Sequence, residues 1–405
     1  SEKWSNGSKL GLMDRAYVFV VCGAAAHIET LHFSLEFLKL RTAVPIYVVT
    51  DTARNEVQIV HNLVQDIRTP SVYTNHQAAI YLKTGVHRFL PAGKRYAYLD
   101  TDILAIGANP DAVFDQFISP IIFAADHCVV EDFSAYAVNC SCLERWQQDW
   151  QRYHTAFAAL DQNKNLQLSP SQEQEKQALQ DLFFALKTKP IQRLISALRY
   201  LLTPRYFQLN QRFVFDKKRR VWQTNSGAIL LHETPNKAIA KQAKLRYNSL
   251  LRTWKTGSGK PLWEAKCTHL QDALQQKFNC PTIPKRWQHW NGGLFIFEDQ
   301  SKAFLDRWHE WSVALFDDPK FKTRDQGTLI ATVWSMGLQD QATLHPKWNF
   351  LLDYHSQDIR FAAADGQFSL KNGPYFSPVF VHVYHHWNDQ NWHLWRWLTE
   401  QKNPT

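Results

Sequence analysis

Two aspartates separated by one residue interrupt an apolar stretch of the sequence. Asp100 and Asp102 stand between residues 96–99 and 103–106, which read as strands. Asp is common in turns, where its side chain bonds the backbone two residues on. Burying a carboxylate is costly unless it is paired or binds a metal, and paired oxygen ligands suit Mg²⁺ or Mn²⁺. The pattern therefore favours a divalent-metal site, with an ordinary turn as the alternative.

The bulk composition is that of an ordinary globular protein. The 405 residues are 45% hydrophobic and 20% charged, and they include 16 Trp. We find no apolar run that approaches the roughly 20 residues of a membrane span, and the N-terminal residues show no signal-peptide pattern. We therefore expect a cytoplasmic protein, peripheral to a membrane if it contacts one.

The positive charge is concentrated in one segment. Residues 187–220 contain ten basic residues and one acidic residue, so this segment alone carries the net charge of +9 of the whole chain. Within it, residues 191–202 have the apolar spacing of an amphipathic helix. Such a helix either packs on its own domain or presents a basic amphipathic face to an anionic membrane or partner. We expect no nucleic-acid binding, because the charge is confined and no nucleic-acid motif is present.

The six cysteines are too few for a disulfide framework in a chain of this length. Cys140-x-Cys142 and Cys267-x-His269 would form a zinc site if they met, but their spacings differ from the usual C-x₂₋₄-C. Free thiols, the default in a cytosolic protein, are the expectation.

Strands alternate with helices in two parts of the chain, residues 15–125 and 285–390. This alternation predicts an α/β fold with a mostly parallel sheet flanked by helices. Gly23, Asp51 and Asp100 each follow a predicted strand, and ligands bind at the carboxyl ends of such strands. We also expect a helix over about residues 55–65. Residues 140–285 read as a mainly helical, basic insertion within a single domain of residues 1–405.

An ordered set of motifs resembles the GT-A (Rossmann-like) fold glycosyltransferases, most closely glycosyltransferase family 8 and its relatives. The motifs are HRFLP (87–91), YLDTDIL (98–104), WNGGLFIF (290–297), RDQGTL (324–329), KWNFL (347–351) and VHVYHHW (381–387). Their order and approximate spacing match the pattern of the family. The resemblance implies a metal-dependent transferase that moves a sugar from a nucleotide diphosphate sugar, with UDP favoured, to an acceptor hydroxyl.

The resemblance also implies roles for individual residues. Asp100, Asp102 and His382 would hold Mn²⁺ or Mg²⁺. Asp325, Gln326 and Asn291 would act on the donor sugar as the catalytic group, with a plain helix N-cap and a plain turn as alternatives. The remaining nucleotide-sugar contacts would come from Cys22, Gly23, Asp51, Arg88, Thr101, Gly292, Gly293, Trp348, Asn349 and His385.

Three features depart from the family pattern. The insertion is longer than the usual spacer, and it contains a second N-x-G stretch at Asn225 that competes with Asn291. The terminal motif lacks the Gly and the phosphate-binding Lys of the family. His385, His386 or a basic residue of the insertion would have to take the role of that Lys.

Several alternatives for the function stay open. The resemblance favours retention of anomeric configuration, and Asp325 is the candidate base if the enzyme inverts. Asp126, Glu131 and Asp132 lie downstream of the acidic pair, where a two-metal phosphoryl- or nucleotidyl-transfer enzyme would need further carboxylates. A non-catalytic binding module that acts through the basic insertion is the third possibility. The sequence identifies neither the donor sugar nor the acceptor.

Overall fold

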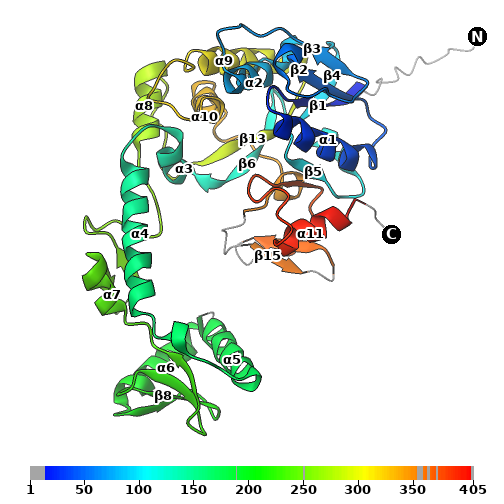
Figure 1. The fold of residues 1–405 in the computed structure, drawn as a ribbon. Coiled ribbons are helices and arrows are strands. Elements are labelled where there is room, and N and C mark those ends of the chain that lie inside the picture. Colours follow the sequence, from blue (N-terminus) through cyan, green and yellow to red (C-terminus); the bar gives the residue numbers. More distant parts are fainter. Residues whose placement is uncertain are drawn as a thin grey trace, which may run out of the picture. The chain divides into compact units, whose positions relative to one another are not determined.

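The chain divides into two units, one of residues 1–141 with 266–405 and one of residues 142–265 (Figure 1). A computed structural model describes residues 14–187, 189–249, 251–353, 359–362, 365–370 and 373–402. Most of the insertion expected at residues 140–285 therefore forms a unit of its own, residues 142–265. The chain leaves the first unit and returns to it through Ser141 and Lys266.

The first unit is built on a six-stranded sheet in the order β3-β2-β1-β4-β13-β6. Strands β1 to β4 pair in parallel, whereas β13 lies antiparallel between β4 and β6. The predicted α/β class with a parallel-rich sheet is confirmed. The bounds are β1 (Asp14–Val20), β2 (Ile46–Thr50), β3 (Val64–Asp66), β4 (Lys94–Leu99), β6 (Ile122–Val129) and β13 (Gln288–Phe297).

Helices bury both faces of this sheet. Alternate residues of the strands contact α1 (Ala25–Lys39) on one face, for example Phe19, Leu99 and Ile296. Their neighbours, Val18, Tyr98 and Phe295, pack on the other face. That face is covered by α2 (Asn75–Thr84), α9 (Lys302–Val313) and α10 (Asp325–Ser335). Burial on both faces explains why these strands are almost continuously apolar.

Smaller elements complete the first unit. A three-stranded sheet in the order β14-β17-β5 adjoins the acidic pair, since β5 follows Asp102 directly. The bounds are β5 (Ile103–Ala105), β14 (Phe350–Leu351), β15 (Ile359–Ala362), β16 (Gln367–Leu370), β17 (Phe380–His382), α3 (Val130–Ala137), α8 (His269–Phe278) and α11 (His393–Glu400).

The expected helix over residues 55–65 is wrong. A short 3₁₀ helix, Thr52–Arg54, is followed by irregular chain and then by β3. The Asn55 side chain accepts from the Gly23 amide (3.1 Å) and donates to Thr50 (2.9 Å). These bonds fix the start of the segment to the ends of β1 and β2 in place of a helical turn.

The second unit is mainly helical, as predicted, but it also contains two antiparallel sheets. Its helices are α4 (Cys142–Leu160), α5 (Pro170–Lys187), α6 (Pro190–Leu202) and α7 (Asn236–Ala243). The sheets are β10-β9-β8-β7 and β11-β12. Their strands are β7 (Tyr206–Gln208), β8 (Phe213–Asp216), β9 (Val221–Thr224), β10 (Ile229–His232), β11 (Arg246–Asn248) and β12 (Thr253–Lys255).

A buried histidine makes the first unit sensitive to acid. His309 of α9 contacts the Thr84 hydroxyl of α2 through Nδ1 (2.9 Å), and burial lowers its pKa to about 4. The unfolded chain binds this proton near pH 6.5, so stability falls as the pH drops from about 6.5 towards 4. We expect urea unfolding of His309→Gln to show a shallower loss of stability over this range than the wild type. An equal slope in both proteins would contradict this assignment, and the exposed His27→Gln serves as the control.

Candidate functional site

The acidic pair lies at the carboxyl edge of the central sheet, in the turn between β4 and β5. The Asp100 amide donates to the carbonyl of Gly293 in β13 (2.8 Å), and the Val383 amide donates to the carbonyl of Asp102 (2.9 Å). The turn is therefore tied to both neighbouring strands. Its carboxylates are partly exposed, at 27% and 29% of their side-chain surface.

His382 joins the pair because of strand register. It pairs with Ile103 across β17 and β5, which places its imidazole beside Asp102, with Nε2 3.2 Å from Oδ1. Burial alone would raise the pKa of Asp102, but the attraction and hydrogen bond of His382, a backbone hydrogen bond and the attraction of Lys83 together outweigh burial and lower it. Burial alone would lower the pKa of His382, but the attraction of Asp102 and Asp100 and the hydrogen bond to Asp102 together outweigh burial and raise it.

The three side chains fit a divalent cation. One ligand atom each from Asp100, Asp102 and His382 lies within 4.8 Å of the others. Two carboxylates and one imidazole are donors that Mn²⁺ and Mg²⁺ accept. The nitrogen of His382 that faces the acidic group is Nε2. The other nitrogen, Nδ1, is buried and has no hydrogen-bond partner among the described residues.

Lys83 is a member of the site that the sequence analysis missed. Its Nζ lies 3.0 Å from Asp100 and 3.3 Å from Asp325, and it therefore bridges β4 to the start of α10. Burial lowers the pKa of Lys83, but the two carboxylates outweigh burial and raise it, so the lysine is a fixed cation. A lysine in the last turn of a helix is usually a solvated residue, and no sequence signal marked this one.

The Asn-Gly-Gly sequence forms a bulge in β13, where the register with β6 shifts between Asn291 and Phe295. Side-chain amides hold this bulge. Gln326 accepts from the Gly292 amide (3.1 Å), and Asn349 donates to Asn291 Oδ1 (3.0 Å). Bulges next to active sites re-aim side chains, and this one presents polar groups beside the acidic pair.

Asp126, which the sequence analysis named only for the two-metal alternative, also lies beside the bulge. It accepts from Asn291 Nδ2 (2.9 Å) and pairs with His127 (2.9 Å). Burial raises its pKa, but His289 and His127 outweigh burial, so Asp126 is held ionised. Its place in the sequence, a charge ending the apolar run of residues 121–125, is the signal that points to it.

Other predicted residues lie at the same edge of the sheet but outside this group. Cys22 and Gly23 follow β1, and Asp51 follows β2. Asp51 is almost fully buried and bonded to Thr69, whose hydroxyl (2.7 Å) and amide (2.9 Å) both donate to it. The Thr101 carbonyl accepts from Ser34 of α1.

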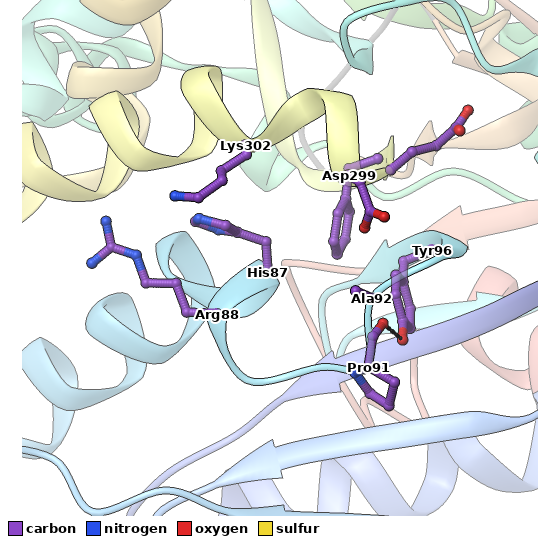
Figure 2. A pocket seen from close by; sticks show the side chains of 9 residues that line it. His87, Arg88, Pro91, Ala92, Tyr96, Asp299 and Lys302 are labelled. Atoms are coloured by element: carbon purple, nitrogen blue, oxygen red, sulfur yellow. Dashed lines mark hydrogen bonds between the residues drawn. The ribbon is translucent and has the colours of Figure 1, made fainter.

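Four predicted residues have different surroundings. Trp348 is buried in the core, and His385 makes an edge-on ring contact with Tyr384, with ring centroids 4.3 Å apart. Asn225 belongs to the second unit, whereas Asn291 belongs to the first unit together with the acidic pair. Arg88 pairs with Asp306 (2.6 Å) and lines a pocket with Tyr96 and Phe297 (Figure 2). Tyr96 lies towards the opposite end of β4 from Asp100.

No family model matches the sequence, and no curated protein matches it significantly. Solved structures similar to it include mouse xyloside xylosyltransferase 1 in its apo form, at 11% identity and a TM-score of 0.35, over 92% of this chain and 98% of that one. The apo bifunctional glycosyltransferase WbbM aligns at 10% identity and 0.40, over 97% of this chain and half of its own. The galactosyltransferase LgtC, in complex with donor and acceptor sugar analogues, aligns at 9% and 0.35, over 96% and 95%. The functional assignment therefore rests on the site residues.

The imidazole of His382 occupies the space that a side chain at position 293 would need. A Cβ at position 293 would lie 2.5 Å from His382 Cε1 and 2.8 Å from Asn291 Oδ1. We expect Gly293→Ala to lower the free energy of unfolding by about 1–3 kcal/mol, the usual cost of overpacking. Chemical denaturation measures this change.

Gly257→Ala is the matched control, since its Cβ would meet nothing closer than 3.7 Å. We expect that variant to change stability by less than about 0.5 kcal/mol. Equal stability of Gly293→Ala and the wild type would show that His382 is not held against Gly293.

Proposed function

We propose that this protein is a metal-dependent glycosyltransferase that moves a sugar from a nucleotide diphosphate sugar, of which a UDP-sugar is favoured, to an acceptor hydroxyl. The observation that carries the proposal is the convergence of Asp100, Asp102 and His382 at the carboxyl edge of the sheet, beside the bulge of β13. The motif resemblance supports the same reading.

In this proposal Asp100, Asp102 and His382 hold Mn²⁺ or Mg²⁺. A divalent cation at this place stabilises the charge that a diphosphate leaving group develops. The ligands need little rearrangement, because backbone bonds from Gly293 and Val383 fix the aspartate turn. Lys83 holds Asp100 and Asp325 in place through its ion pairs with both carboxylates.

The bulge of β13 is suited to the donor sugar. Gly292 and Gly293 allow close approach of a ligand to the backbone, and Asn291, Asp126 and Gln326 surround them with polar atoms. A site built to bond sugar hydroxyls discriminates strongly against a sugar that lacks them.

The surroundings of Asp325 favour retention of configuration over inversion. A general base works best with a pKa near the operating pH. Burial alone would raise the pKa of Asp325, but the attraction of Lys83 and the hydrogen bonds from the Gln326 amide and Lys83 together outweigh burial and lower it. Asp325 is therefore a poor base, and a role in binding the donor suits it better.

A two-metal phosphoryl-transfer enzyme is the less favoured candidate. Within the described residues, no further carboxylate joins the group of Asp100, Asp102 and His382. Asp126 belongs to a separate group and is occupied by Asn291 and His127.

Calorimetric titration of UDP with and without Mn²⁺ tests the proposal. We expect binding that requires Mn²⁺ and that weakens at least about tenfold, or 1.4 kcal/mol, in Asp102→Asn. The exposed Asp317→Asn is the control and should bind as the wild type does. UDP binding that depends neither on Mn²⁺ nor on Asp102 would contradict the proposal. A positive result should be followed by titrations with a panel of UDP-sugars.

The second unit carries a feature that favours contact with an anionic membrane surface. Helix α6 exposes six large apolar side chains, between 51% and 84% of their surface: Ile191, Leu194, Ile195, Leu198, Leu201 and Leu202. Tyr200, on another side of the helix, attaches it to its unit through Phe207 and Phe215. No helix among the described residues reaches the length and apolarity needed to cross a bilayer.

Charge identifies the partner we propose for this face. Arg193 and Arg199 are exposed on α6 itself, and the following residues 203–220 add six basic residues against one acidic residue. An apolar helical face with flanking basic residues suits the interface of a bilayer with anionic lipids. We therefore propose that α6 lies on such a surface.

Cosedimentation with phospholipid vesicles tests the role of α6. We expect binding to anionic but not to neutral vesicles, with a loss of at least about tenfold in Leu198→Gln, because each buried leucine contributes about 1.5–3 kcal/mol. The control Val72→Gln removes an apolar residue of the first unit that is more exposed than Leu198. A different outcome is a wild type that forms a dimer and does not bind vesicles, and a Leu198→Gln variant that is monomeric. That outcome would mean that the face joins two copies of the chain.

A further inference from the structure

Three thiol and imidazole groups of the first unit lie together where the chain leaves that unit and returns to it. Cys140 precedes the departure at Ser141, and Cys267 and His269 follow the return at Lys266. Their ligand atoms lie within 4.8 Å of one another.

The fold holds these residues in position. The Cys267 amide donates to the Glu131 carbonyl of α3 (3.1 Å), and its thiol donates to Ser134 (3.2 Å). His269 is the first residue of α8, and Ser134 also accepts from the Leu270 amide (2.9 Å). Helices α3 and α8 share one buried apolar cluster. The donors therefore stand on packed elements.

The sulfur geometry matches a tetrahedral metal better than a disulfide. The Sγ atoms of Cys140 and Cys267 are 3.9 Å apart. Two sulfurs bound to one tetrahedral ion at about 2.3 Å lie roughly 3.8 Å apart. A disulfide would need a separation of about 2.05 Å.

We propose that Cys140, Cys267 and His269 of the first unit bind a Zn²⁺ ion. Two thiolates and one imidazole are ligands that zinc prefers, whereas the oxygen-rich group of Asp100, Asp102 and His382 suits Mn²⁺ or Mg²⁺. The ion would connect the departing and returning segments of the first unit.

This connection closes a long loop. Cys140 and Cys267 are 127 residues apart in the sequence, and joining distant segments removes entropy from the unfolded chain. Zinc release should therefore affect stability more than it affects the acidic site. The proposal does not depend on the glycosyltransferase assignment, since the two groups of donors differ in residues and in preferred metal.

Metal analysis of the full chain, purified from zinc-supplemented medium without chelators, tests the proposal. We expect about one Zn²⁺ per chain, and sulfur-to-metal charge-transfer bands after replacement by Co²⁺. Cys267→Ser and the exposed His269→Gln should lose the zinc or bind it much more weakly. Cys280→Ser, a buried cysteine outside the group, and Asp102→Asn should keep it.

Three results would overturn the proposal. The first is a wild-type chain without zinc that also shows no thiolate bands with Co²⁺. The second is zinc retained in full by His269→Gln and Cys267→Ser, which would place the ion elsewhere. The third is a Cys140–Cys267 disulfide in the freshly purified, metal-free protein, detected by mass spectrometry. The cobalt spectrum of the wild type decides the question even if Cys267→Ser fails to fold.

Discussion

The structure of the first unit depends on balancing the negative charges of carboxylates that lie close together at one edge of a buried sheet. Asp100, Asp102 and Asp325 converge there, and each is matched by Lys83 or His382. An ion of one sign left without its partner in such a place costs several kcal/mol. The helix that carries Lys83 and the strand that carries His382 therefore have separate roles, because each positions the partner of different carboxylates. Their packing against the central sheet determines whether the charges balance.

The same edge of the sheet also contains a bulge, where the regular pairing of strands is interrupted. The bulge in β13 removes two glycines from regular pairing with β6, and three side chains from different parts of the chain bond it. Asp126 holds Asn291, Asn349 bonds the same amide, and Gln326 bonds Gly292. These contacts join β6, α10 and the segment before β14. Distant motifs of the sequence are therefore parts of one polar network.

Local patterns predict those parts of the fold in which neighbouring residues decide the outcome. Apolar runs and helical spacing identified β1, β4, α1 and α10, and charges within an apolar run pointed to Asp100 and Asp102. His382 required the motif resemblance, because its approach to Asp102 arises from the register of two strands far apart in sequence. Lys83 was missed because its ion pairs are tertiary. The strands of the second unit were missed because they are short and border polar turns.

The proposed zinc site does not depend on a local spacing motif. The C-x-C and C-x-H spacings argue against zinc only if one local motif must supply the turn that brings ligands together. Here helices α3 and α8 supply that positioning, since they pack on each other and carry or flank the donors. Where two segments are held by tertiary contacts, the spacing within one segment no longer decides whether the ligands meet. The ligands proposed here, Cys140, Cys267 and His269, are brought together in this way.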